Sequence, residues 1–157
     1  MSAIVKTAIT EETAKLVRFA PAPTGDLGFG SDLVCVDDFT DNFDELDPSG
    51  VLGMAQDAYH HVTTDRETVP DAPDFGLDMT RYLNTPTTAD GLRAAAGEMK
   101  NELEKDDRFD SVSVTITQES ILFFTVRIVI APKDPLLDTF TLIVAVVNGQ
   151  AHLEAIQ

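Results

Sequence analysis

Histidines, which could bind a metal or transfer protons, are few in this sequence. His60 and His61 are adjacent, so on a helix their side chains point about 100° apart and cannot chelate one ion together. Each could share a helix face with one carboxylate, His60 with Asp57 and His61 with Asp65. The third histidine, His152, has no ligand pattern around it. A catalytic zinc needs three converging ligands, so we expect a solvated histidine pair and no metal site.

Carboxylates are abundant, but their spacing does not predict a catalytic site. The acids between Asp37 and Asp47 do not follow the alternation, with a central glycine and a final glutamate, of a calcium-binding loop. Among 27 acidic residues some close pairs are inevitable, and the chain has no tryptophan and only two tyrosines to build a sugar-stacking cleft. Cys35 has no histidine or basic residue nearby in sequence to activate its thiol, so we expect a structural cysteine. We therefore predict no catalytic residue, no cofactor and no enzymatic activity.

Composition limits the protein classes that remain. The 157 residues are 43% hydrophobic and 24% charged, which is typical of one globular domain. The net charge is −16, and no cluster of Lys and Arg is present, so we expect neither direct nucleic-acid binding nor attraction to an anionic membrane. No apolar run approaches the ~20 residues of a transmembrane helix, and the N-terminus does not resemble a secretory signal. A single cysteine fits a reducing compartment.

The charge is uneven along the chain, and the pattern of residues divides it in two. Residues 1–80 carry 16 acidic and 4 basic side chains, and residues 81–157 carry 11 and 7. We expect residues 1–48 to be an extended acidic segment, with a possible strand at 33–36 and a short helix containing Phe39, Phe43 and Leu46. Residues 49–157 are expected to form the folded domain.

Two helices and a meander of three strands are predicted within that domain. Apolar residues at spacings of three and four predict helices over about 50–64 and about 88–106. Thr87 and Asp90 match the pattern that starts a helix, and Leu92, Ala96, Met99 and Leu103 form its apolar stripe. Alternating or dense β-branched and aromatic residues predict strands at 111–117, 121–130 and 139–147, joined by turns at 118–120 and 132–135. The fold class is α+β, with two main helices packed on a small antiparallel β-meander.

Three segments, in this order, carry a resemblance to a known family. They are Gly30-Ser31-Asp32-Leu33, the stretch from Pro73 to Leu83 that begins Pro73-Asp74-Phe75-Gly76, and the stretch from Leu103 to Phe109 that contains Asp106-Asp107-Arg108. Together they resemble the baseplate wedge proteins of contractile-tailed bacteriophages, a family also called the sheath initiator and labelled "lysozyme-like". The similarity spans about residues 30–147. The family has Glu-Pro-Arg after its long helix, so Arg108 matches, Asp106 keeps the charge and Asp107 replaces the proline.

The resemblance implies a structural role in a virion. It implies that Asp106, Asp107 and Arg108 contact a neighbouring wedge protein, and that the sheet pairs strands with the tail sheath protein. It also implies multiple copies in a tail baseplate that is assembled in the host cytoplasm. Arg108→Glu is then expected to leave the fold intact and to weaken wedge assembly. From the residues alone, an arginine at this place can equally cap the helix end.

The last predicted strand and the Pro-Asp-Phe-Gly segment can also be interpreted from their residues alone. If the strand at 139–147 lies at the sheet edge, its backbone could pair with another chain, and the residues expected to take part are Phe140, Leu142, Val144 and Val146. Gly76 after Phe75 predicts a tight turn that buries the ring, and core packing is the plainer reading of that turn. Two other functions stay open: a peptidoglycan hydrolase, as the family label implies, and an adaptor protein of the same fold.

Overall fold

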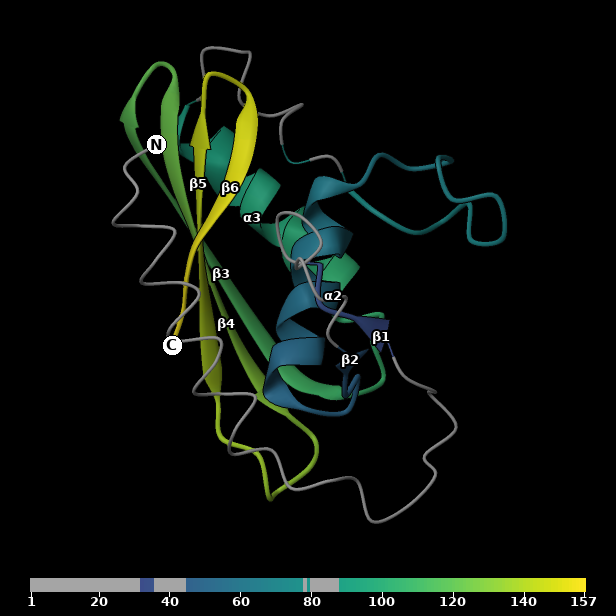
Figure 1. Cartoon of the computed structure of the whole chain (residues 1–157). Coiled ribbons are helices and arrows are strands. Elements are labelled where there is room, and N and C mark those ends of the chain that lie inside the picture. Colours follow the sequence, from purple (N-terminus) through teal and green to yellow (C-terminus); the bar gives the residue numbers. More distant parts are fainter. Residues whose placement is uncertain (1–31, 36–44, 78, 80–87) are drawn as a thin grey trace. The chain divides into compact units, whose positions relative to one another are not determined.

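The computed structural model describes residues 32–35, 45–77, 79 and 88–157 of the chain (Figure 1). The chain divides into two compact units, residues 1–56 and 57–157. The predicted boundary, after residue 48, lies slightly before this division. No helix in the described ranges is both long enough and apolar enough to span a bilayer.

The described part of the first unit is a small strand pair held to the start of a helix. Strand β1 (Asp32–Leu33) pairs antiparallel with β2 (Glu45–Leu46). Gln56 is buried, and its amide donates to the Leu33 carbonyl at 3.0 Å and accepts from the Cys35 N–H at 2.7 Å. Strand β1 begins one residue before the predicted strand at 33–36. Phe39 and Phe43 of the predicted short helix lie outside the described residues, and Leu46, the third member, belongs to β2.

Two helices form where the apolar spacing predicts them. Helix α2 spans Val51–Thr63, and helix α3 spans Ala89–Leu103. The N-cap of α3 is Thr88 rather than the predicted Thr87, because the Thr88 hydroxyl accepts the Gly91 N–H at 3.1 Å. Of the predicted apolar stripe of α3, Met99 and Leu103 are buried, whereas Leu92 and Ala96 are only partly buried. The other buried residues of the helix are Ala95 and Glu102.

The second unit contains a four-stranded antiparallel sheet, so the predicted number of three strands is wrong. The strands are β3 (Phe109–Ser120), β4 (Phe123–Pro132), β5 (Phe140–Val147) and β6 (Gln150–Ile156), in the order β3-β4-β5-β6. The α+β class is confirmed. Strand β6 follows Asn148-Gly149, whose φ angles of 52° and 77° form the left-handed pair that a two-residue hairpin requires.

The core lies on the face of the sheet toward α3 and the C-terminal half of α2. Alternate residues of the two inner strands are almost fully buried there; they are Phe124, Val126, Ile128, Ile130, Leu142, Val144 and Val146. On the other face, Ser113, Thr115 and Thr117 of β3 are exposed. This alternation follows from the two-residue repeat of a strand. Figure 1 shows α3 beside the long, twisted strands.

Strand β5 is therefore an inner strand and not an edge. It pairs with β4 on one side, from Phe140 to Val147, and with β6 on the other. Its backbone is used within the chain on both sides, so it cannot accept a strand from another protein. Phe140, Leu142, Val144 and Val146 fill the core instead. The edges of the described sheet are β3 and β6.

Candidate functional site

The junction between α3 and β3 contains the Asp106-Asp107-Arg108 triplet, and Arg108 is engaged within the chain. Its Nε lies 2.9 and 3.2 Å from the two carboxylate oxygens of Asp106, and its Nη2 also donates to Asp106. The same Nη2 donates to Asp57 of α2 at 2.6 Å. An arginine fork held between two carboxylates fixes the angle between its elements. Arg108 thus joins the start of β3 to α2.

Asp106 is the centre of this junction. Its carboxylate also accepts the Arg108 backbone N–H at 2.9 Å, and its carbonyl accepts the Phe109 N–H at 3.1 Å. Burial would raise the pKa of Asp106, but the hydrogen bonds from Arg108 outweigh burial and leave the pKa below its ordinary value. The hydrogen bonds that Arg108 donates to Asp106 and to Asp57 raise the pKa of Arg108. Asp107, between the two, is exposed.

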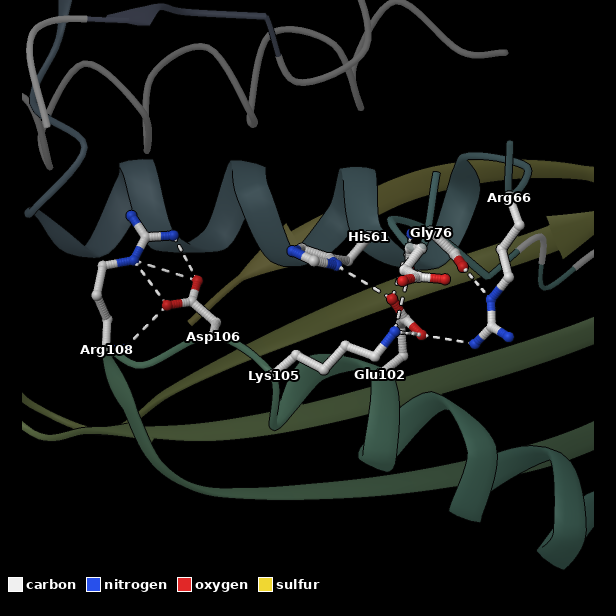
Figure 2. Close-up of polar contacts among 8 residues, drawn as sticks. His61, Arg66, Gly76, Glu102, Lys105, Asp106 and Arg108 are labelled. Carbon is white, nitrogen blue, oxygen red and sulfur yellow. Dashed lines mark hydrogen bonds and ion pairs between the residues drawn. The ribbon is translucent and has the colours of Figure 1, made fainter. Parts of the chain in front are cut away.

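A second cluster surrounds the carboxylate of Glu102, which is only 1% exposed (Figure 2). Arg66 Nη2 and Lys105 Nζ each donate to its Oε2 at 2.8 Å. The backbone N–H of Gly76 donates to its Oε1 at 3.2 Å. Burial alone would raise the pKa of Glu102, but the bonds from Lys105 and Arg66 outweigh burial and lower the pKa.

These bonds tie the segment after α2 to the end of α3. Arg66 also donates from Nε to the Gly76 carbonyl at 2.9 Å, and Lys105 donates to the Asp74 carbonyl at 3.0 Å. The Leu77 N–H donates to the His61 carbonyl at 2.8 Å. We call residues 64–77 the return segment. Because one buried carboxylate holds this segment at several points, removing that carboxylate would release several contacts together.

Pro73, Asp74, Phe75 and Gly76 form a turn in this segment. The Phe75 N–H donates to the Ala72 carbonyl at 3.0 Å. Gly76 has φ 96°, and a Cβ there would lie 2.4 Å from the Thr64 carbonyl oxygen, so glycine is required. The half-buried Phe75 ring lies 4.1 Å from the His61 ring, measured between centroids.

His61 has a buried nitrogen without a hydrogen-bond partner among the described residues. Its Nδ1 lies 3.7 Å from Glu102 Oε1, which is too long for a hydrogen bond. Burial lowers the pKa of His61, against the opposing charges of Glu102, Asp106 and Asp57. The expected partner for His61, Asp65, is not the carboxylate that the structure brings closest. His60 does not converge with it on a metal: the described residues contain no group of three ligand side chains able to hold an ion.

Sequence reasoning identified the triplet but missed the partners that organise it. Asp57 was considered only beside His60, whereas it binds Arg108 from 51 residues away. Glu102 was not singled out, although it lies three residues after Met99 and seven after Ala95, on the buried face of α3. A charged residue at that spacing is the signal that could have pointed to a buried ion pair.

The edge of the sheet formed by β3, which pairs only with β4 among the described residues, is the other candidate site. Within Ser111–Gln118, β3 pairs residue for residue with β4, and a bulge interrupts the register at each end of this stretch. Asp110 and Glu119 lie at the two bulges. The eight residues between the bulges include no charged residue and no proline. Natural edge strands usually carry such residues to prevent pairing with other chains.

The outward backbone groups of β3 follow from the register. Thr141 of β5 and Gln157 exchange both backbone hydrogen bonds, so odd-numbered residues of β5 face β6 and even-numbered ones face β4. Leu142 is opposite Ile128, so even-numbered residues of β4 face β5 and odd-numbered ones face β3. Four residues of β3 therefore direct their N–H and C=O groups away from β4: Val112, Val114, Ile116 and Gln118.

The edge of β6 is less open. The Tyr59 hydroxyl of α2 donates to the Ala151 carbonyl at 3.2 Å, and a register shift interrupts the strand opposite Ile143 and Val144. The longest regular, uncharged edge of the described sheet is therefore that of β3.

Comparison with known proteins adds no name to these sites, because no protein-family model, curated protein or solved structure matches the chain.

Proposed function

We propose that this chain is a structural component of a contractile phage tail baseplate, which joins the wedge to the first sheath ring and initiates sheath assembly by strand pairing. The observation that carries the proposal is the β3 edge, with its eight regularly paired residues and four outward-facing backbone positions. The three segments that resemble the wedge family support it. An edge of this kind binds through main-chain hydrogen bonds and needs no pocket.

The accepting strand in this proposal is β3, in place of the strand at 140–147. An incoming strand would bond to the outward groups of Val112, Val114, Ile116 and Gln118. The bulges beside Asp110 and Glu119 would limit the pairing to the stretch between them. Lys or Arg near the ends of the incoming strand would complement these two acids.

The wedge contact is proposed at Asp107. Arg108 binds both Asp106 and Asp57, so these three side chains shape the junction, while the side chain of Asp107 is exposed. A basic group of the neighbouring wedge protein would meet Asp107 on this fixed turn. The proposal includes multiple copies in the virion tail, assembly in the host cytoplasm, and no direct contact with nucleic acid or membrane.

The test is seeding of sheath polymerisation by the purified chain. Val114→Pro removes an outward N–H from β3 without removing a bond to β4, because proline is tolerated where the N–H faces outward. We expect it to abolish seeding, whereas Ile156→Pro on the β6 edge should seed like the wild type. Ser113→Lys provides a second β3 variant that keeps every backbone donor.

Two outcomes would count against the proposal in different ways. Normal seeding by folded Val114→Pro and Ser113→Lys would show that β3 is not the accepting edge. A wild-type chain that neither seeds nor binds sheath protein would refute the proposed function itself.

A further inference from the structure

One end of the sheet exposes apolar side chains where a turn would ordinarily be polar. Ile121 and Leu122 form the turn between β3 and β4, and their exposed fractions are 79% and 55%. Val147, at the end of β5, is 37% exposed. These are three of the four exposed large hydrophobic residues found in the described part of the chain. We call Ile121, Leu122 and Val147 the apolar tip.

The tip is one rigid surface because two neighbouring turns are bonded together. The Asn148 N–H, in the β5–β6 turn, donates to the Leu122 carbonyl at 3.0 Å. Phe123 is directly opposite Val147 in the register of β4 and β5. The backbones of the two turns are therefore held side by side without a bound partner.

Local structure does not account for Ile121 and Leu122. The neighbouring turn uses Asn148 and Gly149, the residues best suited to the left-handed backbone of a tight hairpin. Ile121 and Leu122 have no positive φ, and the register shift between Gln118 and Ser120 accommodates their turn instead. Polar turn residues would serve the hairpin at least as well, so the apolar pair points to a contact outside the chain.

We infer that the apolar tip docks into a nonpolar pocket of another protein of the tail assembly, with a basic side chain of that protein facing Glu119. This inference rests on the proposed function and concerns the tip beside the β3 edge, with which it shares Glu119. Glu119 is exposed and is the one charged residue in the two turns and their flanks, at 117–125 and 145–151. Its Oε1 accepts from the Thr125 hydroxyl at 3.2 Å, which orients the carboxylate beside the tip.

A second copy of the chain fits the tip less well than such a partner. Three side chains offer a few hundred Å², whereas a stable isolated interface needs about 1,000 Å² or more. Two copies would also bring together chains that each carry a net charge of −16. The area requirement does not apply to a contact that is one of several in a larger assembly. A basic partner would attract the acidic chain, where a second copy would repel it.

The test compares a variant of the tip with a matched change elsewhere. The double variant Ile121→Ser, Leu122→Ser is compared with Leu136→Ser, whose side chain is 89% exposed in the β4–β5 loop. Affinity is measured for each purified sheath and baseplate protein from the same tail. We expect the double variant to bind one of them at least about tenfold more weakly, the effect of losing an interface hot spot, and Leu136→Ser to bind normally. Glu119→Lys should weaken the same complex and reverse its response to salt.

The outcomes separate this inference from the proposed function. If the wild type seeds sheath assembly and the double variant binds every tail protein normally, the docking site is refuted and the proposed function stands. Tip-dependent dimerisation in sedimentation, or tip-dependent binding to phosphatidylcholine vesicles, would replace the proposed partner and overturn the inference. A wild-type chain that binds no tail protein would overturn both.

Discussion

The helix side of the second unit and the free end of its sheet place charged and apolar residues in opposite ways. Near the end of α3, Glu102 and Asp106 are buried or nearly so and bind cations of the same chain. At the sheet end, Ile121 and Leu122 project from a turn, and the neighbouring β3 edge carries no charge for eight residues. Charges that are neutralised internally help to fix the fold, whereas exposed apolar groups and the backbone of an edge strand remain available to another molecule.

The strongest way to break this contrast is to reverse the charge of Arg108. Arg108→Glu would place a third carboxylate against Asp106 and Asp57, so we expect the free energy of unfolding to fall by about 3 kcal/mol. This replaces the expectation from sequence that the fold would stay intact. Urea denaturation measures the change. Arg127→Glu, at an exposed position of β4, is the control and should change stability by no more than about 0.5 kcal/mol. Equal stabilities for the two variants would contradict an internal role for Arg108.

On the helix side, the same substitution, glycine to alanine, is expected to have opposite effects at two positions. Gly76→Ala would press a methyl group against the Thr64 carbonyl at a left-handed φ, and we expect a loss of about 2 kcal/mol. Gly97→Ala in α3 meets no atom within 4 Å and should stabilise the protein by about 0.8 kcal/mol, the helix propensity of alanine over glycine. Thermal unfolding compares the two. A Gly76→Ala protein as stable as the wild type would show that the return segment is not held as described.

The smallest expected effect is a pH dependence caused by His61. Its pKa is lowered by burial in the folded state, so below pH 6.5 the unfolded chain takes up a proton that the folded chain resists. Stability therefore falls as the pH drops from 6.5 toward the lowered pKa. His61→Phe keeps an aromatic ring against Phe75 and removes the titration, so it should lose less stability in this window. Urea midpoints measured at several pH values above 5 give the comparison.

A control separates this effect from the carboxylates. The pKa values of Glu102 and Asp106 are lowered in the folded protein, so their contribution is present above the unfolded-state pKa, near 4, and is lost only as the pH falls below it. Parallel pH profiles for the wild type and His61→Phe would mean that His61 does not titrate differently on folding. A wild type that gains stability on acidification would indicate that protonated His61 pairs with Glu102.

Periodicity predicted the elements well, and its errors have identifiable causes. The helices over 51–63 and 89–103 follow from apolar spacing, which depends only on local geometry. Strand β6 was missed although Asn148-Gly149 precedes it, because its own residues, from Gln150 to Ile156, alternate only weakly. The turn predicted at 118–120 lies instead at 121–122, since apolar residues there resemble strand. Because β6 was missed, the strand at 139–147 was wrongly considered as an edge of the sheet.

The sequence by itself determined the α+β class, the helices and the position of the triplet at the end of the long helix, because these depend on residues close together in the chain. Only the tertiary structure decided that Arg108 binds Asp57, that Glu102 is buried among cations and that β3, rather than β5, lies at an edge of the described sheet. Each of these depends on which distant segments become neighbours. Local spacing carries no such information, since the free energy of pairing two strands or two charges depends on the whole packed fold.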